Sequence, residues 1–124
     1  MSSTCAPESR ATIRNILERI GDKWTVVVIC NLNGASLRYN ELLRLSAPIT
    51  PRMLSATLRA LERDGMVTRT VHPQTPPRVE YALTERGLSL LVTVRDLALW
   101  AEREHEAIAR SRAAYDAAKG SAVS

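Results

Sequence analysis

The stretch between Thr50 and Gly65 constrains the fold most, because it carries start and stop signals for one helix. Thr50 can cap that helix through its hydroxyl, and Pro51 suits the first helical position since it has no N–H to lose. Asp64 and Gly65 end the helix, with the glycine free to adopt a positive φ. The sequence therefore predicts a helix that begins after Thr50 and ends at Asp64.

This helix has two different faces when its residues are placed at about 100° intervals. One face carries Leu54, Leu58 and Leu61. The opposite face carries Arg52, Ser55, Ala56, Arg59 and Arg63. Only small residues separate these arginines, and the planar arginine fork suits phosphate oxygens and the N7/O6 edge of guanine. An ordinary solvated face is the alternative, because charged outer faces are common on amphipathic helices.

The residues that follow favour the DNA-binding interpretation of this helix. Met66 to His72 is rich in Val and Thr, and Val79 to Leu83 alternates apolar and polar residues, so both are predicted strands. The proline-rich segment from Pro73 to Arg78 joins them, and we expect it to hold Arg78 out at its tip. A basic helix followed by such a hairpin is the layout of a winged helix-turn-helix, whose helix enters the major groove while the loop reaches flanking backbone or minor groove.

Two further helices are predicted in the N-terminal part of the chain, before the basic helix. Ile13, Ile16, Leu17 and Ile20 share one face of a helix from about Ala11 to Ile20. Gly21 breaks it, and Asp22 can cap a second helix from Lys23 to about Leu32. The second helix is apolar nearly all round, so we expect it to be central to the core, with Cys30 buried as a small hydrophobe. Its β-branched run leaves a strand as the alternative.

A four-residue turn connects the basic helix to a short helix that precedes it. Leu37-Arg38 is predicted to be extended and to pair with the wing, and a short helix follows from about Tyr39 to Leu45. The turn from Ser46 to Ile49 leads into the basic helix, which is helix-turn-helix geometry with the second helix reading DNA. The candidate DNA contacts are Arg38, Thr50, Arg52, Ser55, Arg59, Arg63 and Arg78.

The last predicted helix follows Thr84 and is unusually apolar. Ten of the fourteen residues from Leu88 to Ala101 are apolar, which exceeds what one buried face needs. A small domain would leave part of this surface exposed, so we expect a second copy of the chain to cover it. The predicted dimer interface consists of Ile13, Ile16, Leu17, Leu90, Val94, Leu97 and Trp100.

Length and composition narrow the class of protein. The chain has 124 residues and a net charge of +4, which fits one mainly α domain with a small β-hairpin wing (α+β) and a polyanionic partner. Met1 to Arg10 lacks the apolar region of a signal peptide, and no run approaches a membrane span, so we expect a cytoplasmic protein. We expect an arm (1–9), a DNA-binding domain (10–86), a dimerisation helix (87–118) and a fraying tail (119–124).

Several motifs occur together in a specific order. They are Ile20-Gly-Asp-Lys-Trp-Thr25, Leu37-Arg-Tyr-Asn-Glu-Leu42, Ile49-Thr-Pro-Arg-Met-Leu54, Leu58-Arg-Ala-Leu-Glu-Arg-Asp-Gly65 and Pro76-Pro-Arg-Val-Glu-Tyr-Ala-Leu-Thr-Glu-Arg-Gly87. From about Ala11 to Trp100 the chain resembles the HxlR family of bacterial transcriptional regulators. This resemblance implies a winged-helix homodimer, joined by its first and last helices, that binds an inverted-repeat operator in double-stranded DNA. We expect it to act as a repressor.

One position departs from that family. Many members carry Cys-Pro just before the first helix, and some use the thiol to sense electrophiles or oxidants. Ala11 and Thr12 stand at the matching positions, whereas Cys5 lies six residues earlier on the expected arm. Cys5 is the one candidate redox thiol, but a mobile arm gives it no fixed partner. We therefore predict that thiol oxidation does not control DNA binding.

Two other functions are alternatives to a DNA-binding regulator. The basic face could bind an acidic protein instead, and salt-sensitive binding to one preferred duplex would separate these possibilities. An enzyme is disfavoured because His72 and His105 are far apart and neither has the neighbours of a triad or metal site. We expect no cofactor and no metal. Trp24 and Trp100 are interpreted as core residues, with an effector pocket as the alternative; a small-molecule effector is left open and unidentified.

Overall fold

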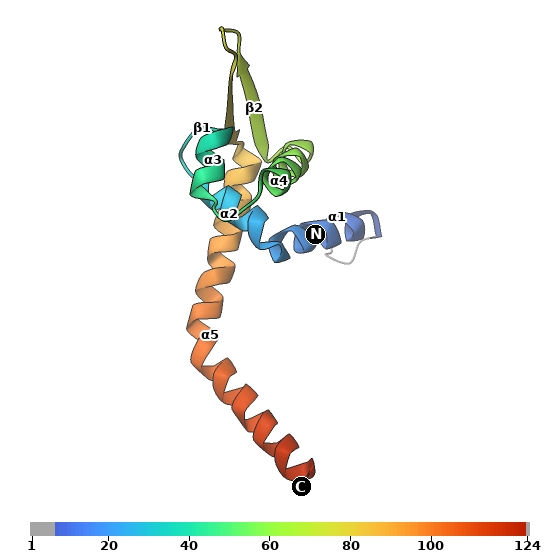
Figure 1. Ribbon diagram of the computed structural model, residues 1–124. Coiled ribbons are helices and arrows are strands. Elements are labelled where there is room, and N and C mark those ends of the chain that lie inside the picture. Colours follow the sequence, from blue (N-terminus) through green and yellow to red (C-terminus); the bar gives the residue numbers. More distant parts are fainter. Residues whose placement is uncertain (1–6, 124) are drawn as a thin grey trace. The chain divides into compact units, whose positions relative to one another are not determined.

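A computed structural model describes residues 7–123, and the side chains of residues 8–120. Its elements are α1 (Pro7–Gly21), α2 (Lys23–Asn31), β1 (Leu37–Arg38), α3 (Tyr39–Leu45), α4 (Pro51–Arg63), β2 (Val67–His72), β3 (Arg78–Leu83) and α5 (Glu85–Val123), shown in Figure 1. The chain forms two compact units, Met1–Val92 and Thr93–Ser124. The mainly α fold with a small β wing is confirmed.

The three strands form one antiparallel sheet in the order β1-β3-β2. Along the wing, Val67 pairs with Leu83 and His72 pairs with Arg78. Leu37 pairs with Tyr81, which confirms that the short extended segment joins the wing. The sheet therefore ties the start of α3 to the hairpin that follows α4.

The core of the first unit is built from the apolar faces of α2, α3 and α4 and the base of the wing. Its fully buried side chains are Val28, Ile29, Leu32, Leu42, Leu54, Leu58 and Leu61, joined by Ile49, Met66, Val67 and Leu91. Half-buried Trp24 packs against this cluster, in agreement with its interpretation as a core residue. The three leucines predicted on one face of α4 are thus confirmed as core residues.

The prediction that α2 is a helix is confirmed, but the burial predicted for Cys30 is wrong. Asp22 Oδ1 accepts a hydrogen bond from the Trp24 N–H at 3.0 Å, which starts the helix and removes the strand alternative. The buried face of α2 consists of Thr25, Val28 and Ile29, spaced three and four residues apart. Cys30 falls outside that stripe and is exposed. The residues before Cys30 are apolar from Val26 to Ile29, yet they are not all on the buried side.

The ends of the first and last helices also differ from expectation. Helix α1 begins at Pro7, so residues 7–9 are helical rather than part of an arm. Proline suits a first turn and Glu8 complements the positive end of the helix dipole, which favours this earlier start. Helix α5 extends to Val123, five residues beyond the predicted end of the dimerisation helix at residue 118. No helix among the described residues is both long and apolar enough to cross a membrane.

Gly87 fixes the first turn of α5 against the base of the wing. A Cβ atom at Gly87 would collide with the Met66 carbonyl and crowd the Leu83 side chain. Thr84 caps this turn, because its Oγ1 accepts the Gly87 N–H at 3.1 Å and donates to the Gly65 carbonyl at 2.6 Å. The glycine in this first turn is therefore a packing requirement, and the beginning of α5 belongs to the first unit.

Candidate nucleic-acid interface

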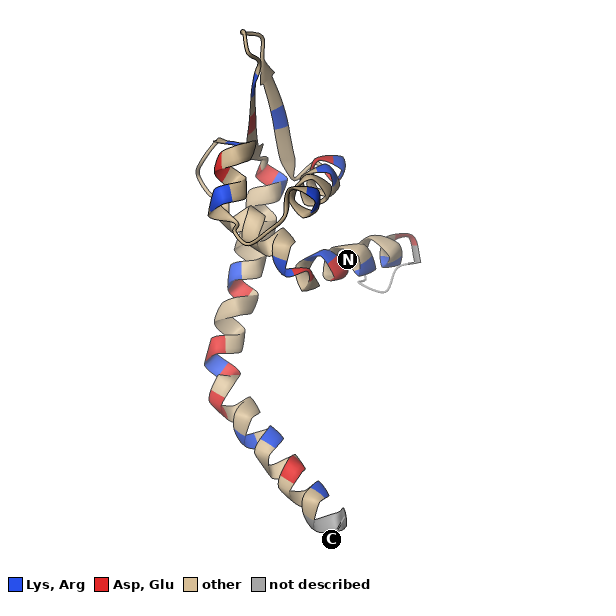
Figure 2. Ribbon diagram, in the orientation of Figure 1, with Lys and Arg blue, Asp and Glu red and all other residues tan. Residues whose placement is uncertain are grey.

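Helix α4 presents the basic face that the sequence predicts. Thr50 Oγ1 accepts the Met53 N–H at 3.2 Å, and Pro51 occupies the first turn. With the leucines buried, Arg52, Arg59 and Arg63 are exposed on the other side. Figure 2 shows this helix carrying several basic residues on its ribbon. Because arginine remains protonated at any physiological pH, the face is a permanent row of positive charge.

Ser55 is less available on this face than the sequence suggests. Its side chain is half-buried, and Ser55 Oγ lies 3.0 Å from the Tyr39 hydroxyl oxygen. The same tyrosine hydroxyl donates to the Pro51 carbonyl at 2.9 Å. Tyr39 thus ties α3 to the first turn of α4 and positions Ser55. Sequence reasoning missed this contact because it joins residues sixteen positions apart whose types carry no pairing signal.

Arg78 is not held out at the tip of the loop, and this expectation is wrong. It is the first residue of β3, and its side chain is only 35% exposed. Arg78 Nε lies 3.8 Å from Glu80 Oε1, and Nε has no hydrogen-bond partner. Glu80 Oε1 also lies 2.6 Å from His72 Nε2. The wing carboxylate therefore lies close to both Arg78 and His72, and the loop prolines do not extend Arg78 away from it.

Arg38 lies in the same compact unit as α4 and the wing. It is exposed at the junction of β1 and α3, and its backbone N–H donates to Glu41 Oε1 at 2.9 Å. Its Cα partner in the sheet is Glu80, on the strand that also begins with Arg78. The structure therefore brings candidate DNA contacts from β1, α4 and the wing onto one compact unit.

Two exposed arginines near this surface, Arg69 and Arg44, were not assigned from sequence. Arg69 on β2 and Arg59 on α4 line a pocket of about 210 Å³, together with Tyr39 and Ser55. Arg44 is exposed in the last turn of α3. Alternation along β2 could have placed Arg69 on a sheet face, but only the packing of α4 beside β2 shows which arginine it adjoins.

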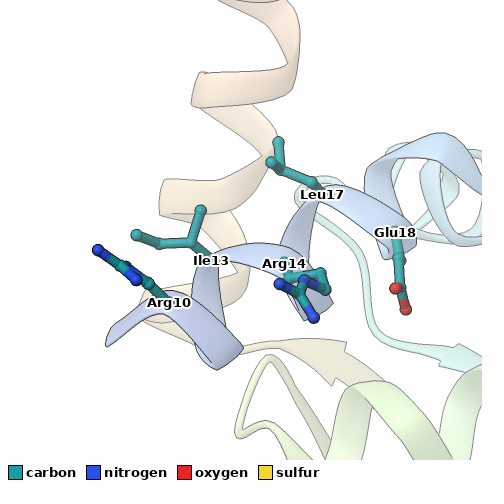
Figure 3. A pocket seen from close by; sticks show the side chains of 5 residues that line it. All are labelled: Arg10, Ile13, Arg14, Leu17 and Glu18. Carbon is teal, nitrogen blue, oxygen red and sulfur yellow. The ribbon is translucent and has the colours of Figure 1, made fainter. Parts of the chain in front are cut away.

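An apolar patch lies on α1, away from the candidate DNA contacts in sequence. Ile13 and Leu17 project to one side of the helix, whereas Glu18 projects to another (Figure 3). Together with Arg10 and Arg14, these three residues line a pocket of about 460 Å³. The Leu17 side chain is 63% exposed. Ile16, also predicted at the dimer interface, packs instead against the core of its own chain.

Helix α5 leaves large apolar side chains uncovered. Leu97 is 52% and Trp100 is 51% exposed, so Trp100 is not the core residue that its apolar position suggests. Leu88, Val92 and Leu99 are exposed as well. Leu90 packs against the core and Val94 is half-buried, so these two are less available to a partner than predicted.

Among the described residues, no group of three or more His, Cys, Asp or Glu side chains could hold a metal ion. His72 is engaged with Glu80, and His105 is exposed on α5. Cys5, the candidate redox thiol, lies outside the described residues.

Known proteins match this chain over most of its length. The sequence model of the HxlR-like helix-turn-helix family matches residues 19–109. An HTH-type transcriptional regulator of Methanothermobacter thermautotrophicus is 42% identical over 93 residues, covering 75% of this chain and 71% of that protein. The HTH-type transcriptional regulator YdeP of Bacillus subtilis is 39% identical over 105 residues, covering 85% and 82%. A MarR-family transcriptional regulator structure from Enterococcus faecalis matches with a TM-score of 0.74 at 34% identity, covering 88% and 99%.

The fold, the basic helix and these similarities define the protein as a winged helix-turn-helix transcriptional regulator, a class that binds DNA. The family match extends over well more than half of the sequence. The chain belongs to the HxlR-like helix-turn-helix family, which confirms the resemblance found in its motifs.

Proposed function

We propose that the protein is a homodimeric repressor that binds an inverted-repeat operator in double-stranded DNA in the cytoplasm. The exposed arginine row of α4 carries the proposal, because it is a helix face with a permanent positive charge on a DNA-binding fold. In this arrangement Arg52 and Arg59 contact base edges in the major groove. Arg38, Thr50, Arg63 and Arg78 lie at the backbone, while Ser55 is positioned through Tyr39.

The uncovered apolar side chains support the homodimer. Leu17 on α1 is a large exposed apolar side chain, and so are Leu97 and Trp100 on α5. Large apolar side chains left uncovered on a helix favour association with another protein surface. Two-fold symmetry then requires a palindromic operator, with half-sites about one helical turn apart or a multiple of it. A dimer seated on such a site excludes other proteins from the same base pairs, which is the physical basis of repression. A small-molecule effector is compatible with this proposal but is not part of it.

The test is selection of the operator from random duplexes, followed by binding measurements at several salt concentrations. We expect a palindromic consensus, a stoichiometry of two chains per duplex and a steep fall in affinity with salt. Sedimentation that shows a monomer at micromolar concentration, still binding the operator at full affinity, would rule out the dimer. Placing the selected operator upstream of a reporter gene then determines whether the protein represses it.

A further inference from the structure

The C-terminal end of α4 is held by two arginines from other helices. Asp64 is the residue that caps this end. Arg19 Nε, from the last turn of α1, donates to Asp64 Oδ2 at 2.7 Å. Arg86 Nη1, from the first turn of α5, donates to the backbone carbonyl of Asp64 at 2.9 Å. One residue at the end of the basic helix therefore contacts both of the helices proposed for dimerisation. We call Arg19, Asp64 and Arg86 the Asp64 cluster.

The backbone next to Asp64 leaves room for these contacts. Gly65 has a φ of +74°, which ends α4 and turns the chain toward the wing. A Cβ atom at Gly65 would collide with the Arg86 guanidinium, so the glycine lets that side chain cross the turn. The Arg19 and Asp64 side chains are 25% and 28% exposed, so their charge-assisted hydrogen bond is partly shielded from water.

Helix α4 has little direct packing against α1 or α5. Few backbone positions of α1 or α5 lie close to α4, whereas α1 packs against α2. A pocket of about 300 Å³ opens beside the Asp64 cluster, lined from α1 by Thr12, Asn15 and Ile16. Because this space separates the helices, the polar contacts at Asp64 carry much of their connection to α4.

A small tilt of α4 has a large effect on how two copies fit one duplex. Its 13 residues span about 20 Å at about 1.5 Å per residue. A tilt of about 10° displaces one end by about 3.5 Å, close to the ~3.4 Å between successive phosphates of one strand. The first turn is already tied to α3, because the Tyr39 hydroxyl donates to the Pro51 carbonyl. The contacts at Asp64 therefore limit the tilt that remains.

We infer that the Asp64 cluster fixes the tilt of α4 relative to the helices of the dimer interface, and so sets the half-site separation that the dimer accepts. Arg19, Asp64 and Arg86 are positioning residues, and none of them is among the candidate DNA contacts or the predicted interface residues. The inference rests on the proposed homodimer and operator, and it adds the residues that determine operator spacing. Since two-fold symmetry applies any displacement to both copies, a loosened α4 tolerates several separations.

The experiment measures binding to three duplexes by Arg19→Ala, Asp64→Ala and the double variant. One duplex is the selected operator, one has a base pair inserted between the half-sites, and one keeps a single half-site. The native protein should prefer the operator over the inserted duplex by roughly ten-fold, because the mismatch must be met by deforming DNA. Each variant should reduce this preference to about two-fold while binding the single half-site within about two-fold of the native protein. The double variant should match the single ones, because both residues form one contact.

The matched control is Glu62→Ala, an exposed residue of α4 two positions before Asp64. It removes the same charge from the same helix end and leaves the Arg19–Asp64 pair in place, so its spacing preference should equal that of the native protein. Asp64→Asn keeps the shape of the side chain and should fall between the native protein and Asp64→Ala. Arg86→Ala removes the other contact and should also weaken the preference. Thermal unfolding and sedimentation check that the variants remain folded dimers.

Three results would overturn the inference. The first is an unchanged spacing preference in both Arg19→Ala and Asp64→Ala. The second is an equal loss of affinity on the operator and on the single half-site, which would show that the cluster only supports the fold of α4. The third is dissociation of the variants into monomers, which would trace the loss to the dimer interface. A native protein without any preference for two half-sites would instead remove the proposed dimeric repressor itself.

Discussion

Helices α4 and α5 both leave one side uncovered, but the uncovered sides have opposite chemistry. Helix α4 buries its leucines completely and exposes arginines such as Arg52 and Arg59. Helix α5 exposes Leu97, Leu99 and Trp100, each about half accessible. A single chain therefore buries the apolar face of α4 and leaves large apolar side chains of α5 exposed. Under the proposed function, the basic surface of α4 contacts DNA and the apolar surface of α5 contacts a second copy of the chain.

The largest expected effect distinguishes the apolar residues of the two helices. Leu54→Ala removes a fully buried side chain of α4 and should lower the free energy of unfolding by about 2–5 kcal/mol. Leu97→Ala is the matched change on α5, and its cost should grow with protein concentration because it acts through the dimer. Denaturant melts at several concentrations measure both. If both substitutions lowered the free energy of unfolding equally at every protein concentration, the apolar residues of α4 and α5 would not differ in role.

The next effect concerns the arginines of α4. Loss of a base-reading arginine should weaken operator binding by about 1–3 kcal/mol and relax specificity at one base pair. Arg52→Ala and Arg59→Ala, alone and combined, test this by titration of operator variants. Arg95→Ala, an exposed arginine of α5, is the control. Intact operator affinity in the double variant would show that α4 does not enter the groove.

The sequence predicts the features that depend on residues close together in the chain, and it does not predict those that depend on packing between distant residues. The bounds of α3 and α4 match expectation because caps and stops are local signals, such as Thr50 and Pro51. The side on which Cys30 lies could not be predicted, since the residues from Trp24 to Ile29 are nearly all apolar and packing alone selects which of them are buried. The same holds for Tyr39, whose hydroxyl contact with Ser55 depends on how two helices cross.

A smaller effect is expected in the wing, where Glu80 competes with DNA for Arg78. Arg78→Ala should weaken binding to all duplexes about equally and lower the salt slope by about one unit. Glu80→Gln should act in the opposite direction, because it removes the carboxylate 3.8 Å from Arg78 Nε and leaves the guanidinium to phosphate. Salt titrations on operator and unrelated DNA measure both changes. A loss confined to one base pair in Arg78→Ala would make this residue a base reader.

No effect on operator affinity is expected from thiol oxidation. The exposure of Cys30 removes one reason for that prediction, since its thiol is accessible after all. Cys30 lies in the last turn of α2, which carries none of the candidate DNA contacts, so its modification should not reach them. Operator binding is measured before and after diamide in the native protein, in Cys5→Ser and in Cys30→Ser. A loss that reductant reverses, and that either serine variant prevents, would identify a sensor thiol.

The close packing of Gly87 determines where a junction could be placed in a chimera between this regulator and a relative. The first turns of α5 pack Gly87 closely against the Met66 carbonyl and bury Leu91, so they belong to the DNA-binding unit. A chimera joined directly after Thr84 would replace a residue that has no room for a side chain. A chimera joined after Val92 would exchange only the second unit and leave the basic face of α4 and the wing unchanged. The helix is continuous, but the interchangeable part begins two turns inside it.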